Sequence, residues 1–242
     1  MNDLRGNVLS SVDRAHLVAA GDVTIASSEA SSLSSILSGS TESPAEDPAA
    51  EAGTDVAGGG GTGGAAKPMA VNALIANNVV LGSSRALLTK SQVEAEGSLT
   101  LQADNVADIT AENTATMSSG GSAVGATLAF NTMGWESQNV LFKAVDALVG
   151  SNIGDEDPLV ALAKAETVEL ALGGDLNVLS NMQATLTATT SNEASSESAG
   201  AAASMVLASN MVSTDAQAFI LQPNDSEAYA LSVAGAVTVQ TD

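Results

Sequence analysis

The sequence has no cysteine and very few aromatic residues. Without cysteine, neither a disulfide framework nor a thiolate metal site can form. The aromatics among the 242 residues are Phe130, Trp135, Phe142, Phe219 and Tyr229. A conventional globule of this length would use more of them, because each removes a large area from water. An interior of Ala, Val, Leu, Ile and Met instead indicates thin, repeated layers.

Basic residues are also scarce, with 7 Lys and Arg against 28 Asp and Glu and a net charge of −21. Such a surface repels nucleic-acid phosphates and anionic lipid headgroups. No segment reaches the ~18 consecutive apolar residues of a membrane span. We therefore expect no nucleic-acid partner and no membrane insertion. The first residues have no apolar signal-peptide region, so an export signal would lie outside this chain.

Internal repeats are the main positive feature of the sequence. Four segments share the pattern Gly, any residue, Leu or Val, Thr or Asn, then an aliphatic residue, and they begin at Gly21, Gly97, Gly174 and Gly235. The glycines are 76 (97 − 21), 77 (174 − 97) and 61 (235 − 174) residues apart. Each segment indicates a glycine turn followed by a short strand.

A second pattern alternates with the first and ends at Asn78, Asn131 and Asn210. We predict that these asparagines end strands at corners, where left-handed backbone or amide stacking is tolerated. Short apolar segments follow each asparagine, at residues 85–88, 139–142 and 217–220. Repeating strands with polar outer faces predict an all-β fold, a parallel β-helix or β-solenoid in which each repeat pairs with the next. We expect one such segment over residues 1–242, with strands over about 8–37, 69–142 and 167–242.

Two regions interrupt the pattern. Residues 38–68 are acidic and rich in Gly and Pro, which predicts a flexible loop. Residues 143–166 are expected to form an inserted, partly helical decoration. Apolar residues at helical spacing support a helix that ends near Gly150, and Asp157 with Pro158 at the first helical position would begin a second one.

Catalytic chemistry finds little support in the sequence. His16 is the single histidine and lies near the N-terminus, in a presumed strand. A hydrolytic triad and a zinc site built on several histidines are therefore excluded within this chain. The serines lack the nucleophile-elbow pattern. We expect no catalytic residue, no cofactor-binding residue and no enzymatic activity. Asp155, Glu156 and Asp157 are the candidate metal ligands, since three carboxylates in one turn suit Ca²⁺.

The segments AVNALIANN, AVGATLAFN with GWESQNVLF, GSLTL and GDLNV resemble the repeat arrays of giant exported bacterial proteins of the filamentous-haemagglutinin-like adhesin type. The resemblance implies a right-handed parallel β-helix, an extracellular or cell-surface location and a role as a stalk or adhesive surface. It implies no catalytic residues.

The leading interpretation is therefore a structural and adhesive segment of a large secreted or cell-surface protein, a rigid acidic stalk or interaction surface. Its expected partners are neighbouring repeats of the same protein and cell-surface glycans or proteins. Two alternatives stay open. One is a carbohydrate-active β-helix enzyme, for which paired carboxylates in a groove would be the mark. The other is an extracellular assembly module that depends on Ca²⁺.

Overall fold

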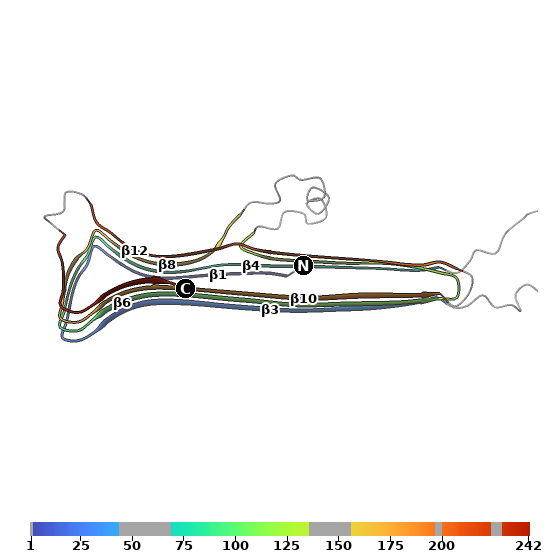
Figure 1. Cartoon of the computed structure of the whole chain (residues 1–242), viewed down its shortest axis with the longest axis horizontal. Coiled ribbons are helices and arrows are strands. Elements are labelled where there is room, and N and C mark those ends of the chain that lie inside the picture. Colours follow the sequence, from blue (N-terminus) through green and yellow to red (C-terminus); the bar gives the residue numbers. More distant parts are fainter. Residues whose placement is uncertain (1, 44–68, 136–155, 197–199, 224–228) are drawn as a thin grey trace, which may run out of the picture.

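The structure, a computed structural model, describes residues 2–43, 69–135, 156–196, 200–223 and 229–242 (Figure 1). Its regular elements in these ranges are all β-strands, so the expected all-β class is confirmed. The described residues include no helix long and apolar enough to cross a membrane.

The strands form three sheets in which every strand pairing is parallel. Sheet A contains β1 (Asn2–Asp13), β4 (Met69–Thr89), β7 (Ser122–Met133), β8 (Leu159–Glu166), β11 (Ala202–Val212) and β12 (Thr214–Leu221). Sheet B contains β2 (His16–Ala19), β5 (Gln92–Ala95), β9 (Glu169–Leu172) and β13 (Leu231–Val233). Sheet C contains β3 (Val23–Ser43), β6 (Leu99–Ser119), β10 (Leu176–Ser196) and β14 (Val237–Thr241).

The chain visits sheets A, B and C in that order four times. We call these passes repeat 1 (β1–β3), repeat 2 (β4–β6), repeat 3 (β7–β10) and repeat 4 (β11–β14). Sheets A and C are long and run side by side, and sheet B crosses between them at one end (Figure 1). Each repeat therefore lies directly beside the previous one, strand against equivalent strand.

Alternation of side chains explains why these segments form strands. In β6, Leu99, Leu101 and Ala103 are buried and the intervening Thr100 and Gln102 are partly exposed, and this alternation continues along the strand. A period of two places one set of side chains between sheets A and C and the other on the outer face. Ala, Ser and Thr are the commonest inward residues far from sheet B, and the larger Leu74 and Met117 lie against Gly39 and Gly125 across the interior.

The interior changes in character along its length. Next to sheet B, side chains from all three sheets form the larger apolar cluster: Ile25, Ala86, Leu88, Val93, Ala95, Leu99, Leu101, Ala103, Ala163, Ala165, Val168, Leu170, Leu172, Leu176 and Val178. A smaller cluster follows between sheets A and C: Leu33, Val80, Ala107, Ile109, Met133 and Leu159. Still farther from sheet B, buried Asn113 and Thr127 have polar atoms without a hydrogen-bond partner among the described residues. The apolar stabilisation is thus concentrated near sheet B.

Repeat 3 contains the interruption expected from the sequence, but the described part of it is not helical. Residues 159–166 form β8, which pairs with the second half of β4, while β7 pairs with the first half. The expected second helix from Asp157 is therefore wrong. Its apolar residues alternate in strand fashion, with Leu159, Ala161, Ala163 and Ala165 buried. Residues 136–155, including the expected first helix, lie outside the described residues.

Two further boundaries differ from expectation. Residues 38–43 continue β3 instead of beginning a loop, because their small Ser, Gly and Thr side chains fit an alternating strand in register with β6. The rest of that predicted loop, residues 44–68, lies outside the described residues. The partner of residues 85–88 in repeat 3 is residues 162–165, not 139–142 as the sequence pattern suggested.

A glycine closes the base of the interruption. Gly134 has φ +73°, a left-handed value, and its carbonyl accepts a hydrogen bond from the Asp157 amide at 3.1 Å. A Cβ at this position would overlap the Ser213 carbonyl oxygen of repeat 4. Trp135 and Glu156 form an antiparallel bridge just beyond it. Gly134 therefore lets the chain leave and re-enter sheet A while repeat 4 passes close beside it.

Candidate functional site

The four repeat glycines lie at equivalent positions between sheets B and C. The Gly174 amide donates to the Gly97 carbonyl at 2.9 Å, and the Gly235 amide donates to the Gly174 carbonyl at 3.0 Å. A Cβ on Gly97 would overlap the backbone of Gly21, and one on Gly235 would overlap the Asp175 carboxylate. Glycine is therefore required at Gly97, Gly174 and Gly235, where each repeat closely approaches the previous one, whereas a Cβ on Gly21 would meet nothing within 4 Å. This is a structural role.

The repeat asparagines form a ladder of side-chain amides. Asn2 Nδ2 donates to Asn78 Oδ1 at 2.8 Å, Asn78 Nδ2 to Asn131 Oδ1 at 2.8 Å, and Asn131 Nδ2 to Asn210 Oδ1 at 3.0 Å. Asn78 and Asn131 are completely buried between the long sheets. Stacked amides satisfy one another across the strand spacing, as in other parallel in-register arrays. The sequence pattern did not include Asn2, although it lies 76 residues before Asn78.

These asparagines do not lie at corners, which corrects the sequence-based expectation. They occupy strand interiors in β4 and β7, in mutual register. The left-handed corner positions, between sheets A and B, are instead Arg14 (φ 52°), Lys90 (φ 47°) and Thr167 (φ 56°). Their amides donate to carbonyls of the following repeat, for example Lys90 N to Glu166 O at 2.9 Å. No residue preference marks this corner, so the sequence offered no signal for it.

A band of buried polar residues separates the two apolar clusters. Asn105 Nδ2 crosses from sheet C to the carbonyls of Gly82 and Val160 in sheet A, at 3.2 and 3.0 Å. Ser84 Oγ donates to Ser27 Oγ at 2.8 Å, also across the interior. These bonds hold the two long sheets in one relative position, because an unmade buried bond is costly.

Glu29 is the one inward carboxylate of sheet C, and it lies in the same polar band with only 7% of its surface exposed. Its Oε1 accepts a hydrogen bond from Ser31, and Oε2 has no partner among the described residues. Gly6 and Gly82 in sheet A leave room for it, since a Cβ on Gly6 would overlap the carboxylate. The Glu29 carboxylate therefore occupies the space that a side chain at position 6 would fill.

The acidic turn proposed as a metal site is only partly described. Asp155 lies outside the described residues. Glu156 Oε1 accepts a hydrogen bond from Ser213 Oγ, and the Asp157 amide bonds to Gly134. Among the described residues, no group of three or more His, Asp or Glu side chains is arranged to hold a metal ion.

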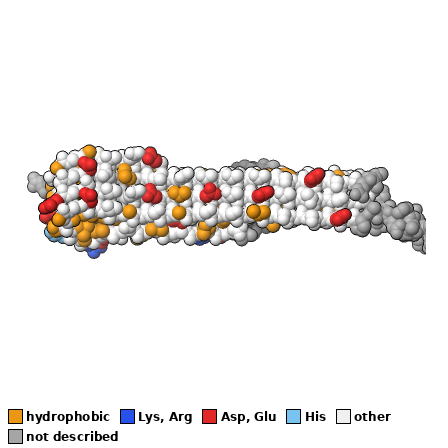
Figure 2. All heavy atoms as spheres, turned by 90° about the horizontal axis from the view of Figure 1, so that it is seen from below, with side chains coloured by type: hydrophobic (Ala, Val, Ile, Leu, Met, Phe, Trp, Pro, Cys, Tyr) orange, Lys and Arg blue, Asp and Glu red, His pale blue; other side chains and the backbone are white. Residues whose placement is uncertain are grey.

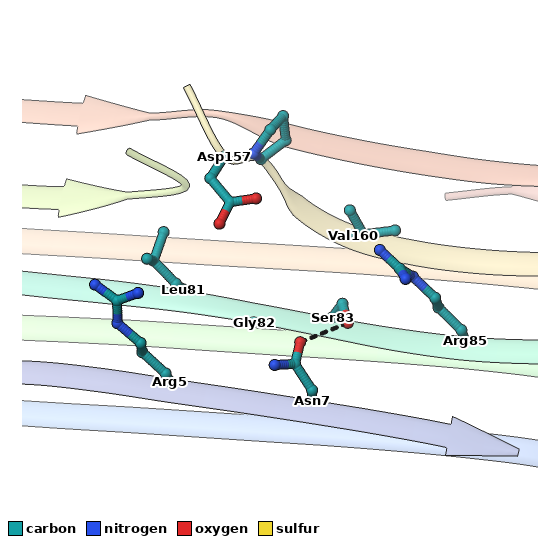
Figure 3. Close-up of a pocket in the computed structure, with 9 residues that line it drawn as sticks. Arg5, Asn7, Leu81, Gly82, Ser83, Arg85, Asp157 and Val160 are labelled. Carbon is teal, nitrogen blue, oxygen red and sulfur yellow. Dashed lines mark hydrogen bonds between the residues drawn. The ribbon is translucent and has the colours of Figure 1, made fainter. Parts of the chain in front are cut away.

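A small cavity of about 110 Å³ opens on the outer face of sheet A (Figure 3). Arg5 and Asn7 from β1 line one side and Asp157 the opposite side, with Leu81, Gly82 and Ser83 of β4 between them. Arg85 lies at one end of the hollow, where its side chain reaches toward Val160 (Figure 3). Asn7 Oδ1 accepts a hydrogen bond from Ser83 Oγ at 2.7 Å. Cationic donors, an amide and a carboxylate in one hollow are the groups that bind hydroxyl-rich ligands. We refer to this hollow as the outer-face cavity.

Another hollow, of about 350 Å³, lies at the corner between sheets A and B. It is lined by Arg14, Ala15, His16, Lys90, Ser91, Gln92, Glu169 and Tyr229. His16 Nε2 and Glu94 Oε1 are 3.1 Å apart, which gives the single histidine a structural partner across β2 and β5. Ser91, which also lines this hollow, donates its hydroxyl to the Thr89 carbonyl at 2.7 Å and not to His16.

Charge is distributed unequally between the two long sheets. The strands of sheet C contain no Lys or Arg, and their outward carboxylates include Asp104, Asp108 and Glu112. Acidic side chains are spread along the face of the molecule seen in Figure 2. The basic residues that the structure describes lie in sheet A or at its corner with sheet B: Arg5, Arg14, Arg85, Lys90 and Lys164. The outer-face cavity is therefore on the less acidic side of the molecule.

Comparison with known proteins found no matching family model, curated protein or solved structure. These comparisons therefore support no particular function.

Proposed function

We propose that the chain is a segment of a right-handed parallel β-helix that serves as a structural and adhesive element of a large secreted or cell-surface protein. The observation that carries this proposal is the register of the sheets. Equivalent residues such as Val23, Leu99, Leu176 and Val237 stand side by side in four successive repeats. A chain that passes the same three sheets in the same order suits a helical coil of strands.

The right-handed sense is supported by a general rule. Connections between parallel strands of one sheet are right-handed in nearly all proteins, because right-twisted strands pack back on the sheet only that way. Each repeat here is such a connection, leading from one strand of sheet A through sheets B and C to the next. The resemblance to exported adhesin repeats agrees with this architecture.

The structural part of the role follows from where the ordered interactions lie. Backbone pairing, the amide ladder and the polar band all join one repeat to another or one sheet to another. Such interactions make a stiff slab with flat outer faces. Flat Ser- and Thr-rich faces offer many weak polar contacts and suit a surface that spaces or presents other parts of a protein.

The adhesive part of the role is assigned to the outer-face cavity. Arg5, Asn7, Arg85 and Asp157 combine donors and acceptors in a hollow large enough for part of one sugar ring. Arg85 is exposed, and its guanidinium can donate several hydrogen bonds in a fixed fork. We assign cell-surface glycans as the ligand class, in keeping with the absence of enzymatic activity expected from the sequence.

Glycan binding is tested with the purified chain on a panel of immobilised neutral and acidic glycans. Arg85→Ala should weaken binding by ~10-fold, the equivalent of about 1.4 kcal/mol, while Arg14→Ala, a matched change in the corner hollow, should leave it unchanged. No binding to any glycan would refute the adhesive role. Shortening of the glycan during the assay would instead support the enzyme alternative.

The location is tested separately with antibodies against this chain on cells that produce it. Intact cells, or the medium around them, should react with the antibody. Reaction only after the cells are made permeable would refute a secreted or surface role.

A further inference from the structure

The half of sheet A that lies away from sheet B has an apolar outer face. Side chains from three neighbouring strands form it in register: Val71 and Ile75 of β4, Val124 and Leu128 of β7, and Met205 and Leu207 of β11. Ala126 lies at the centre, between Ala73 and Met205. We call this surface the apolar face.

The exposure of the apolar face is not an effect of a sheet edge. β7 is paired on both sides, with β4 and with β11, yet Val124 is 45% exposed. Val71 and Ile75 on β4 are 56% and 51% exposed. Val124 points away from the interior, because Ala123 and Gly125 on either side of it are buried. A further strand added at either edge of sheet A would therefore leave Val124 uncovered.

The sequence of these strands is typical of strands that are covered on both faces. β7 reads SAVGATLAFNTM, in which most inward and most outward positions are apolar or small. Strands covered on both faces have near-continuous apolar runs, whereas strands with one solvated face alternate. β6 of sheet C does alternate, with Asp104, Asp108 and Glu112 pointing outward. The outer side of sheet A in this half is therefore suited to a cover.

The absence of charge determines what can cover the apolar face. Residues 69–84, 122–133 and 202–214 contain no Lys, Arg, Asp or Glu. A charged partner surface would lose its hydration there without gaining an opposite charge, which is costly. The partner surface must therefore be flat, apolar and uncharged, and the same face of a second copy has these properties. Two copies, each with a net charge of −21, repel wherever their acidic surfaces meet, so this face is also where they can approach each other.

The size of the apolar face is at the lower limit for a specific contact. Strands advance ~3.3 Å per residue and lie ~4.8 Å apart, so three strands over the 11 residues of β11 offer about 500 Å². Two such faces would together bury about 1,000 Å², the smallest area expected of a biological interface. The contact between two single chains should therefore be weak and reversible.

We propose that two copies of this chain pair laterally, with the apolar face of one copy packed on the apolar face of the other. The two sheets would stack about 10 Å apart, as in a β-sandwich. A two-fold axis through the centre of the face would place Ala126 near its counterpart. Sheet C of each copy, with its carboxylates, would lie on the outside of the pair. This pairing goes beyond the stalk and adhesive role proposed above and does not involve the outer-face cavity.

The first experiment measures molar mass by light scattering at chain concentrations up to ~1 mM, which detects dissociation constants up to about that value. The wild-type chain should rise from its monomer mass of 23.8 kDa towards twice that mass and no further. Association should be stronger in ~500 mM than in ~50 mM NaCl, because salt screens the repulsion between two acidic copies.

Val124→Glu should weaken the association at least ~10-fold, because it places like charges in the contact. Ile36→Glu is the matched control. Ile36 is 74% exposed on the outer face of sheet C, so this variant adds the same charge to the opposite side of the molecule and should associate like wild type.

The second experiment tests whether like faces meet. Ala126→Glu and Ala126→Lys should each associate more weakly than wild type, because each places two like charges at the centre of the contact. An equal mixture of the two variants should associate more strongly than either variant alone, since opposite charges then face each other. Circular dichroism confirms the β fold of every sample, and the changes at positions 124 and 126 test the contact independently of each other.

Three outcomes would overturn the lateral pairing: a wild-type chain that stays monomeric at every concentration and salt level, equal weakening by Ile36→Glu, or a mixture of the Ala126 variants that associates no better than its components. Sedimentation of a monomeric wild-type chain with vesicles of neutral phosphatidylcholine would assign the apolar face to a lipid surface instead. Failure of glycan binding, by contrast, would leave the pairing intact.

Discussion

At the scale of single residues, the amide ladder and the left-handed corners matter most. The ladder depends on side chains that are buried and bonded on both sides, as Asn131 is to Asn78 and Asn210. The corners depend on backbone conformations that most side chains disfavour, as at Thr167. These two features make opposite predictions for substitution.

Asn131→Ala should destabilise the protein by about 2 kcal/mol, because it leaves a buried donor on Asn78 and an acceptor on Asn210 without partners. Asn210→Ala is the control, since it ends the ladder and removes one bond at an exposed position, and it should cost about half as much or less. Chemical denaturation of both variants gives the comparison. A negligible cost for Asn131→Ala would mean that the ladder is not stabilising.

Thr167→Asn should stabilise the protein by ~0.5–1 kcal/mol, because a β-branched residue is strained at φ 56° and asparagine tolerates that conformation. Thr89→Asn, one position before the equivalent corner and inside β4, should give no gain. Thermal unfolding midpoints measure both changes. A lower midpoint for Thr167→Asn would show that the threonine side chain compensates for the strain.

At the scale of elements, sheet A shows how an insertion is tolerated within a strand. β4 runs unbroken past the point where β7 ends and β8 begins. In repeat 4 only Ser213 separates β11 from β12, and its amide bonds to the Met133 carbonyl at 2.8 Å. Gly134 and Leu159 therefore occupy adjacent positions of the sheet.

A deletion of residues 135–158 that joins Gly134 to Leu159 should consequently still fold, with β7 and β8 merged into one strand. The variant should keep its β spectrum and a cooperative transition, at lower stability because the Trp135–Glu156 bridge and the hydrogen bond between Ser213 and Glu156 are lost. Loss of cooperative unfolding would show that the deleted residues are required for the sheet.

The sequence predicted the elements well where repeats recur and poorly where they do not. The glycine pattern located the first residues of sheet C in all four repeats. In repeats 2 to 4 the close approach of the previous repeat permits nothing larger than glycine. The helix expected from Asp157 was wrong, because Leu159 to Ala165 read equally well with a period of two. The outer-face cavity was not predicted, because Arg5, Arg85 and Asp157 are far apart in the chain and share no motif.

At the scale of the whole molecule, the charge distribution determines how stability responds to ions. Sheet C carries outer carboxylates with no basic residue in its strands, and the chain has a net charge of −21. Self-repulsion of this kind opposes the compact state and is screened by salt. The described residues provide few salt bridges in compensation, such as the exposed Arg5–Asp3 pair.

The unfolding midpoint should therefore rise by a few degrees when NaCl is raised from ~10 to ~150 mM. Ca²⁺ at the same ionic strength should have a similar effect if screening is the only cause. Scanning calorimetry in NaCl, MgCl₂ and CaCl₂ makes the comparison. A distinctly larger shift in CaCl₂ would favour the assembly module that depends on Ca²⁺ and would direct attention to the carboxylates near Asp157.

The spacing between paired strands also determines how this chain must acquire its structure. The shortest sequence separation between paired residues is 53, between β4 and β7. Paired residues of β1 and β4 are 76 positions apart. Since the paired strands are all far apart in the sequence, the entropy of closing a long loop opposes the pairing of the first two repeats. Once repeats 2 and 3 have joined, each further repeat has a ready edge on which to form. Folding should therefore be slow to begin and directional afterwards, so a chain emerging in order from a ribosome or a secretion pore would fold by elongation of a preformed template.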